Sequence, residues 1–204
     1  RPQSRRGAPR PSRSPGHLEP LEFGRSADRG AGAVAFEEAH GRDPLLLTRL
    51  AEAHWRTGRE NDARLAINEA LEQSQELPQV QKQVVGAFHA AFNGRWREAR
   101  QTFKSLYLSQ GDFSLGLWVL ESRNNEGIKG SVPKLLESLQ ASLAEGQRDV
   151  RLDLFRLRER WIAYDHQGAI SIAREAVKLA ADNDLPQLEF RALLALHSVL
   201  RSTG

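Results

Sequence analysis

Residues 58–64 (GRENDAR) and residues 94–100 (GRWREAR) repeat the pattern G-R-x-x-x-A-R at an interval of 36 residues. Side chains that form one helical stripe recur every third or fourth residue on both sides of the first copy: Leu47, Leu50, Ala51 and His54 before it, and Ala63, Ile67, Ala70 and Leu71 after it. This spacing predicts two amphipathic helices. Gly58 stands between them, and a residue without Cβ can adopt the left-handed conformation that ends a helix. The repeated stretch therefore predicts a helix, a tight turn and a second helix, used more than once along the chain.

The positions of these small residues resemble the tetratricopeptide repeat. With Pro44 as position 1, the family's signature positions 8, 15, 20, 24 and 27 hold Ala51, Gly58, Ala63, Ile67 and Ala70. With Val80 as position 1, a second unit supplies Ala87, Gly94, Ala99 and Phe103 at the corresponding places. Small residues are needed where the two helices of a unit cross, because bulkier side chains would hold the helices apart. The resemblance implies an all-α fold, an α-α superhelix in which antiparallel helix pairs wind into a right-handed solenoid.

Further units are expected along most of the chain. The resemblance implies units at about 44–79, 80–112, 113–149 and 150–189, with a partial unit at 31–43 and a truncated unit at 190–204. In the fourth unit, Tyr164 replaces the glycine of the turn. Leu193, Leu196 and Leu200 predict a last apolar helix that has no second helix after it. This feature and the absence of methionine predict a fragment of a longer protein, truncated at both ends.

Residues 1–30 differ from the rest of the chain in composition. The first 16 residues hold five arginines and no acid, whereas the 204-residue chain has 29 Lys+Arg, 26 Asp+Glu and a net charge of +3. Arginine-rich segments can bind phosphate backbones, but these 16 residues contain no aromatic side chain on which a base could stack. We therefore expect residues 1–30 to be disordered, with nucleic-acid binding limited to non-specific contacts of the arginines. A second interpretation is that this segment is not native sequence, since its composition resembles an out-of-frame translation of GC-rich DNA.

Composition and motifs exclude several classes of function. The chain has no cysteine, which excludes disulfides, thiolate metal sites and cysteine nucleophiles. Its six histidines include no pair spaced to ligate a metal from one helix face, and neither a phosphate-binding loop nor a kinase motif occurs. No run of 18 apolar residues is present that could span a membrane. We therefore expect a protein that is not an enzyme, with no catalytic, cofactor-binding or metal-binding residues and no cofactor. The absence of cysteine fits a cytoplasmic location, although a membrane-anchored parent could hold this region outside the cytoplasm.

The resemblance also implies a binding surface for a protein or peptide. In tetratricopeptide repeats, positions 2, 5, 9, 12 and 13 of each first helix line a concave groove that usually binds peptides. In this sequence the candidate groove residues at those positions are Glu52, Trp55, Arg56, Phe88, Phe92, Asn124, Asn125, Arg151, Arg158 and Trp161.

The aromatic candidates have a structural alternative. Trp55 and Trp161 occupy the same repeat position, where they either anchor a ligand or pack on a neighbouring unit. Phe88 and Phe92 lie one helical turn apart, a spacing that also suits two residues of the core.

The polar candidates have a structural alternative as well. Arg151 and Arg158 share a helix face and could bind a carboxylate or phosphate by forked hydrogen bonds. Nearby acids can neutralise them, however, and charged runs on helices are usually solvated. Asn124 and Asn125 resemble the asparagine with which some family members clamp a C-terminal carboxylate. The companion lysines do not fall at the required positions, so we do not expect such a clamp.

A second stretch of sequence resembles one particular group of tetratricopeptide proteins. Residues 148–154 (RDVRLDL), followed by residues 160–169 (RWIAYDHQGA), resemble the C-terminal tetratricopeptide region of bacterial signalling proteins that carry a winged-helix or serine/threonine-kinase domain. Two functional hypotheses follow. The first is a non-catalytic scaffold for protein–protein interaction, whose groove binds a peptide or partner domain. The alternative is a regulatory region of such a kinase or transcriptional regulator, with the effector domain outside this chain.

Overall fold

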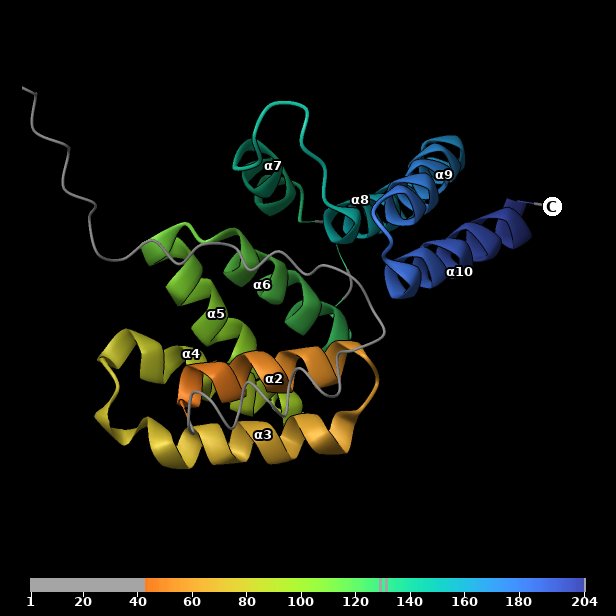
Figure 1. Ribbon diagram of the computed structural model, residues 1–204. Helices are drawn as coiled ribbons and strands as arrows, with labels where there is room; N and C mark the ends of the chain where they lie inside the picture. The colour runs from red at the N-terminus through yellow and green to blue at the C-terminus, as the bar shows by residue number, and fades with distance from the viewer. Residues whose placement is uncertain (1–42, 129, 131, 204) are drawn as a thin grey trace, which may run out of the picture.

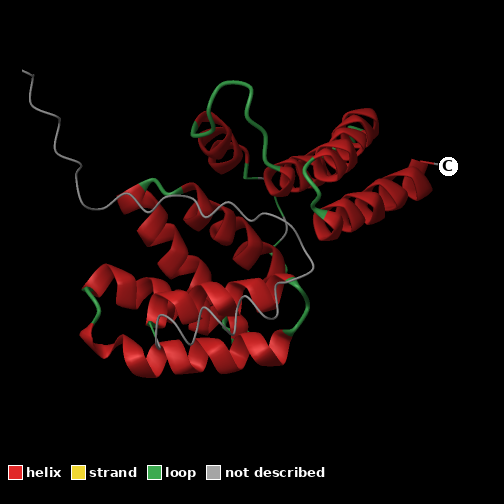
Figure 2. Ribbon diagram, viewed as in Figure 1, coloured by secondary structure: helices red, strands yellow, loops and turns green. Residues whose placement is uncertain are grey.

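The computed structural model describes residues 43–203 except residues 129 and 131. Within this part of the chain, 81% of the residues are helical and no strand occurs. Figure 2 shows these helices joined by loops, of which the one between α7 and α8 forms a wide arc. The predicted all-α class is thus confirmed for the described residues. The predicted basic segment 1–30, and the predicted partial unit 31–43 apart from its last residue, lie outside them.

Nine α-helices follow one another in the described part of the chain and pack as adjacent pairs (Figure 1). They are α2 (Pro44–Arg56), α3 (Glu60–Gln73), α4 (Gln79–Phe92), α5 (Trp96–Gln110), α6 (Phe113–Asn125), α7 (Pro133–Ala141), α8 (Val150–Ile162), α9 (His166–Asp182) and α10 (Pro186–Thr203). A 3₁₀ turn, η1 (Ser74–Glu76), lies between α3 and α4. In Figure 1 the helices α2 to α6 form one block and α8 to α10 form a second, with α7 between them.

Aspartates begin the first helix of three pairs. The Asp43 carboxylate accepts a hydrogen bond from the amide of Leu45 at 2.8 Å, and the Asp112 carboxylate accepts one from the amide of Leu115 at 3.1 Å. Asp149 caps α8 in the same way. The first turn of a helix leaves amides without a partner inside the helix, and a carboxylate at this place stabilises the helix by about 1 kcal/mol. Local sequence therefore determines where these helices start.

The turn inside a pair requires a residue in the left-handed conformation. Gly58 and Gly94, the glycines of the repeated stretch, have φ angles of 76° and 78°. Tyr164 occupies the same place between α8 and α9 with a φ angle of 59°, and its side chain is 84% exposed. This conformation costs a residue with a Cβ atom about 1–2 kcal/mol. The turn between α8 and α9 is therefore strained where the glycine turns are relaxed.

Replacing Tyr164 with glycine should stabilise the protein by about 0.5–1 kcal/mol. Glycine adopts the left-handed conformation without strain, and its greater freedom in the unfolded chain offsets part of the gain. Urea unfolding followed by circular dichroism measures the change. Gly94→Ala makes the reverse exchange in the turn between α4 and α5 and should destabilise the protein. If Tyr164→Gly were destabilising instead, contacts of the tyrosine ring, such as that with the His166 ring at 6.3 Å, would outweigh the strain.

Apolar side chains are buried in a row of clusters along the chain. The largest cluster lies among α2 to α6 and includes Ile67, Phe88, Phe103 and Trp118. A second cluster, around Leu139, joins α6, α7 and α8. Two smaller clusters join α8, α9 and α10. Each helix pair therefore buries its apolar surface against its neighbours, and this packing decides which candidate residues remain on the surface.

Candidate functional site

Glu52, the first predicted groove residue, lies at the centre of a buried polar network. Glu52 lies on α2, and the residue is only 8% exposed. One carboxylate oxygen lies 3.0 Å from Arg49 Nη1, and the other lies 2.5 Å from Arg56 Nη2. The indole N–H of Trp118, on α6, donates to the second oxygen at 3.0 Å. The network therefore links α2 to α6, through two residues that are 66 positions apart in the sequence.

The neighbours of Glu52 hold it in its charged form. Burial by itself would raise the pKa of the Glu52 carboxyl, but Arg56 and Arg49 and the Trp118 hydrogen bond together hold that pKa below its usual value of 4.5. The two guanidinium groups compensate the negative charge inside the fold. Glu52 and Arg56 thus act as structural partners of each other, and the Arg56 guanidinium carbon also lies 5.9 Å from the centre of the Trp118 ring.

Stability should fall in acid through Glu52. Because the folded pKa is below the unfolded one, the stabilisation by the charged carboxylate is complete above about pH 4.5 and is lost as the pH falls through the folded value. Glu52→Gln should cost about 1–2 kcal/mol at neutral pH, and its difference from wild type should shrink as the pH falls below 4.5. Urea unfolding at a series of pH values measures this. Glu60→Gln, which removes a 56% exposed partner of Arg64, serves as control and should have little effect. A pH-independent difference for Glu52→Gln would contradict the charge-based account.

The structure corrects the prediction that Phe88 and Phe92 face a groove. Both lie on α4 and are at most 1% exposed. The ring of Trp118 covers them, with ring centroids 4.9 Å from Phe88 and 5.7 Å from Phe92. Trp55 is half-buried and stacks on Phe92 at 5.0 Å and against Trp96 at 5.5 Å, so it packs on the neighbouring pair. These three candidates therefore contribute to the packing of the first block.

Three of the polar candidates, Asn124, Asn125 and Arg158, lie where α6 meets α8. An N–H of the Arg158 guanidinium donates to the side-chain oxygen of Asn124, so the structure brings these two predicted residues together. Asn125 donates instead to the backbone oxygen of Glu121 on its own helix at 2.9 Å. Arg191 of α10 lies 3.8 Å from the Glu121 carboxylate, which connects this junction to the last helix.

Arg151 does not join that junction. Its guanidinium is held by the carboxylate of Asp149, the cap of α8, at 2.6 Å. Burial alone would raise the pKa of the Asp149 carboxyl, but its hydrogen bonds to Arg151 and to amides of the first turn hold the pKa below its usual value. The predicted arginine pair therefore does not converge on a shared anion site, because Arg151 and Arg158 have different acceptors within the fold.

Exposed apolar side chains gather in the second block. Among the described residues, eleven large apolar side chains are exposed, and eight of them lie between residues 161 and 200. The eight are Trp161, Ile162, Tyr164, Leu185, Phe190, Leu193, Leu194 and Leu200. Trp161, at the end of α8, is 39% exposed. It is the aromatic groove candidate that belongs to this exposed group. Four of the others belong to α10.

We call Phe190, Leu193, Leu194 and Leu200 the outer face of α10. These side chains are 61%, 45%, 50% and 44% exposed, respectively. Ala192 and Val199, on the opposite side of the helix, are fully buried. Leu193 and Leu200 were predicted to belong to an apolar helix, but not to the groove. Phe190 and Leu194 were missed, although Phe190 lies three residues before Leu193 and four before Leu194, a spacing that places side chains on one helix face.

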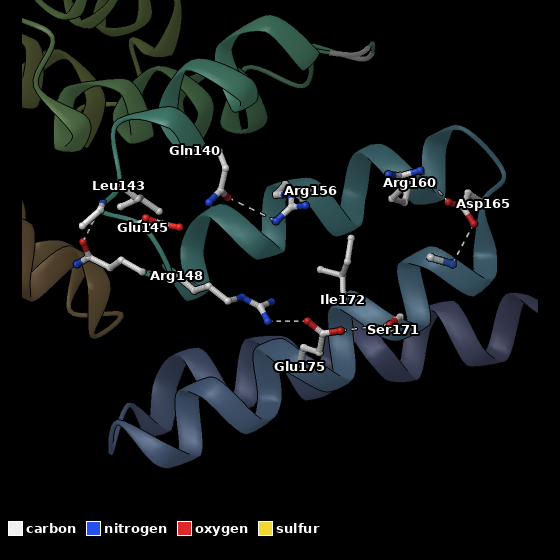
Figure 3. A pocket seen from close by; sticks show the side chains of 14 residues that line it. Gln140, Leu143, Glu145, Arg148, Arg156, Arg160, Asp165, Ser171, Ile172 and Glu175 are labelled. Carbon is white, nitrogen blue, oxygen red and sulfur yellow. Dashed lines mark hydrogen bonds and ion pairs between the residues drawn. The ribbon is translucent and has the colours of Figure 1, made fainter.

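A polar cleft of about 740 Å³ lies between α8, α9 and the loop that follows α7 (Figure 3). It is lined by three arginines and three acids, namely Arg148, Arg156, Arg160, Glu145, Asp165 and Glu175. Arg148 lies 2.5 Å from Glu175, and Arg160 lies 3.1 Å from Asp165. Because these charges cancel within the fold, the cleft is better explained as a seam of ion pairs than as a site for a charged ligand.

The part of the chain that the structure describes has neither a metal-binding cluster nor a membrane-spanning helix. No group of three or more histidine, aspartate or glutamate side chains is arranged to hold a metal ion there. Likewise, none of the described helices is long and apolar enough to cross a membrane. Comparison of the chain with models of known protein families, with curated proteins and with solved structures found no match.

Proposed function

We propose that this chain is a non-catalytic protein-interaction module of the tetratricopeptide type, in which helix pairs form a right-handed superhelix. In this proposal the second block, and above all the outer face of α10, binds a partner protein or peptide. The observation that carries the proposal is the apolar character of α10 on two opposite sides. Ala192 and Val199 are buried against the rest of the block, while four large apolar side chains face outward.

Physical chemistry supports an interaction at this face. A surface helix normally turns a polar side to water. The helix α10 has exposed polar residues such as Arg191 and His197, but it exposes four large apolar side chains as well. Single exposed apolar residues are common, but a contiguous group of them marks an interaction site. Phe190, Leu193 and Leu194 fall within one and a half helical turns of each other, so they form such a group. Covering a side chain of this size contributes about 1.5–3 kcal/mol when it is buried completely.

Site-specific photocrosslinking tests the proposed function. A photoreactive phenylalanine derivative replaces Leu193 in the full chain, and the same derivative replaces Leu65 in a control, because Leu65 is 70% exposed on α3. In an extract of the source cells we expect a discrete crosslinked product from position 193 and none from position 65. Leu194→Ser should abolish the product. Equal crosslinking from both positions, or none from position 193, would contradict an interaction surface on α10.

A further inference from the structure

A second sequence repeat aligns α10 with α4. Residues 77–80 (LPQV) lead into α4, and residues 185–188 (LPQL) lead into α10. The offset between them is 185 − 77 = 108 residues, three times the 36-residue interval between the two G-R-x-x-x-A-R stretches. The packing agrees with this alignment, since α4 contacts both helices of the pair before it, α2 and α3, and α10 contacts both α8 and α9. The two helices therefore occupy equivalent places in the repeat.

The equivalent positions differ in what covers them. The offset of 108 aligns Val85 with Leu193 and Phe92 with Leu200, and all four residues are apolar. Val85 and Phe92 are fully buried, whereas Leu193 and Leu200 are 45% and 44% exposed. These two apolar positions are thus inside the fold on α4 and exposed on α10, while Phe190 and Leu194 of the outer face align with Lys82 and Gly86.

Helices on both sides of α4 in the chain cover it: Trp55 of α2 stacks on Phe92, and α5 and α6 cover Phe88. Phe88, between the two positions just compared, has its ring 5.1 Å from the ring of Phe103 on α5 and 4.9 Å from that of Trp118 on α6. Its counterpart on α10 is Leu196, which is half-buried. The helix that directly follows α4 in the chain and packs on it is α5. It is amphipathic, and its buried residues are Ala99, Phe103 and Leu106, spaced by four and three residues. In the part of the chain that the structure describes, no helix covers the outer face of α10 in this manner.

From this comparison we infer that the outer face of α10 docks an amphipathic helix of a partner protein, placed on α10 as α5 is placed on α4. The inference rests on the proposed function and specifies the occupant of the same surface. The partner helix carries a small residue, then an aromatic or aliphatic residue one turn later, and a further large apolar residue after that. Its outer side is polar, as that of α5 is apart from Leu108.

The segment that covers α4 supplies a probe for this inference. A synthetic peptide of residues 95–111, held helical by a side-chain staple and labelled with a fluorophore on its polar side, presents Ala99, Phe103 and Leu106 on one face. Fluorescence anisotropy then measures its binding to the full chain. We expect saturable binding, which the double substitution L193S/L194S weakens by about tenfold or more, because a few buried apolar anchors contribute most of the binding energy at such an interface.

Two controls make the test specific to α10. The pair L65S/L108S removes two side chains that are 70% and 73% exposed on α3 and α5, and it should leave binding unchanged. A peptide with Phe103→Ser should bind about tenfold more weakly to the wild-type chain. Circular dichroism of each protein variant shows that its helices are intact before binding is measured.

The outcomes separate this inference from the proposed function. Absence of saturable binding, or binding that L193S/L194S does not alter, would overturn the helix-docking inference. A chain that sediments as a dimer, and as a monomer after L193S/L194S, would overturn it in favour of a second copy as the occupant. If position 193 crosslinks a partner while the helical peptide fails to bind, the interaction surface stands and its occupant is not a helix. If both experiments fail, the proposed function falls with the inference.

Discussion

Replacing Trp118 with alanine should lower the free energy of unfolding by about 3–5 kcal/mol. The indole ring is 3% exposed and stands among three phenylalanines of the first block. Its centroid lies 4.9 Å from that of Phe88 and 5.7 Å from those of both Phe92 and Phe103. Removing the ring leaves a cavity where three helices meet, and it takes away a hydrogen-bond donor from the buried carboxylate of Glu52. Urea unfolding monitored by far-ultraviolet circular dichroism measures the loss.

Trp118→Phe separates the two contributions of the indole. Phenylalanine keeps most of the apolar ring but has no N–H to donate to Glu52, so this variant should lose about 1–2 kcal/mol. The remaining difference from Trp118→Ala then reports the packing of the ring. If the phenylalanine variant were as unstable as the alanine variant, the hydrogen bond to Glu52 would be the dominant contribution. If neither variant lost stability, the aromatic cluster could not be the core of the first block.

The helix pairs were predictable because the signals that form them are local. The repeated stretch at 58–64 and 94–100 combines a helical apolar period with a glycine at the point of reversal. Both glycines adopt the left-handed conformation that this pattern predicts. Such features depend on residues within one or two turns of each other, so a single sequence carries them. The assignment of the pairs to the tetratricopeptide family, the boundaries of its units and the superhelix remain predictions.

The groove was less predictable because burial depends on helices that are distant in sequence. The repeat register placed Phe88 and Phe92 on a concave face, but it contained no information that Trp118 would cover them. Trp55 and Trp161 also show that burial could not be predicted from the repeat. The repeat register assigns both tryptophans the same position, but the residues around them differ. Trp55 stacks on Phe92, whereas the alignment of α4 with α10 puts the smaller Leu200 at the equivalent place. Trp161 keeps 39% of its surface exposed.

Replacing Asp153 with alanine should destabilise the second block by about 2–3 kcal/mol. The carboxylate is 2% exposed, lying 2.7 Å from Arg148 Nη2 and 3.3 Å from Arg156 Nη1. Removing one partner of a buried ion pair commonly costs about 3–5 kcal/mol, because it leaves an uncompensated charge. The two arginine side chains are 36% and 41% exposed, so water can solvate them after the substitution and the expected loss is smaller. Chemical unfolding read through hydrogen exchange in α8 and α9 measures it.

Glu175 provides a matched control for this prediction, because it binds the same arginine from the surface. Its carboxylate lies 2.5 Å from Arg148 Nη1 but is 52% exposed, compared with 2% for Asp153. Water already competes for the exposed pair, so Glu175→Ala should cost about 0.5 kcal/mol or less. Asp153→Asn keeps the size of the side chain and one acceptor oxygen, and it should fall between the two alanine variants. Equal losses for Asp153→Ala and Glu175→Ala would mean that burial adds nothing to the ion pair. The seam of charges along the cleft would then make no special contribution to holding α8 and α9 together.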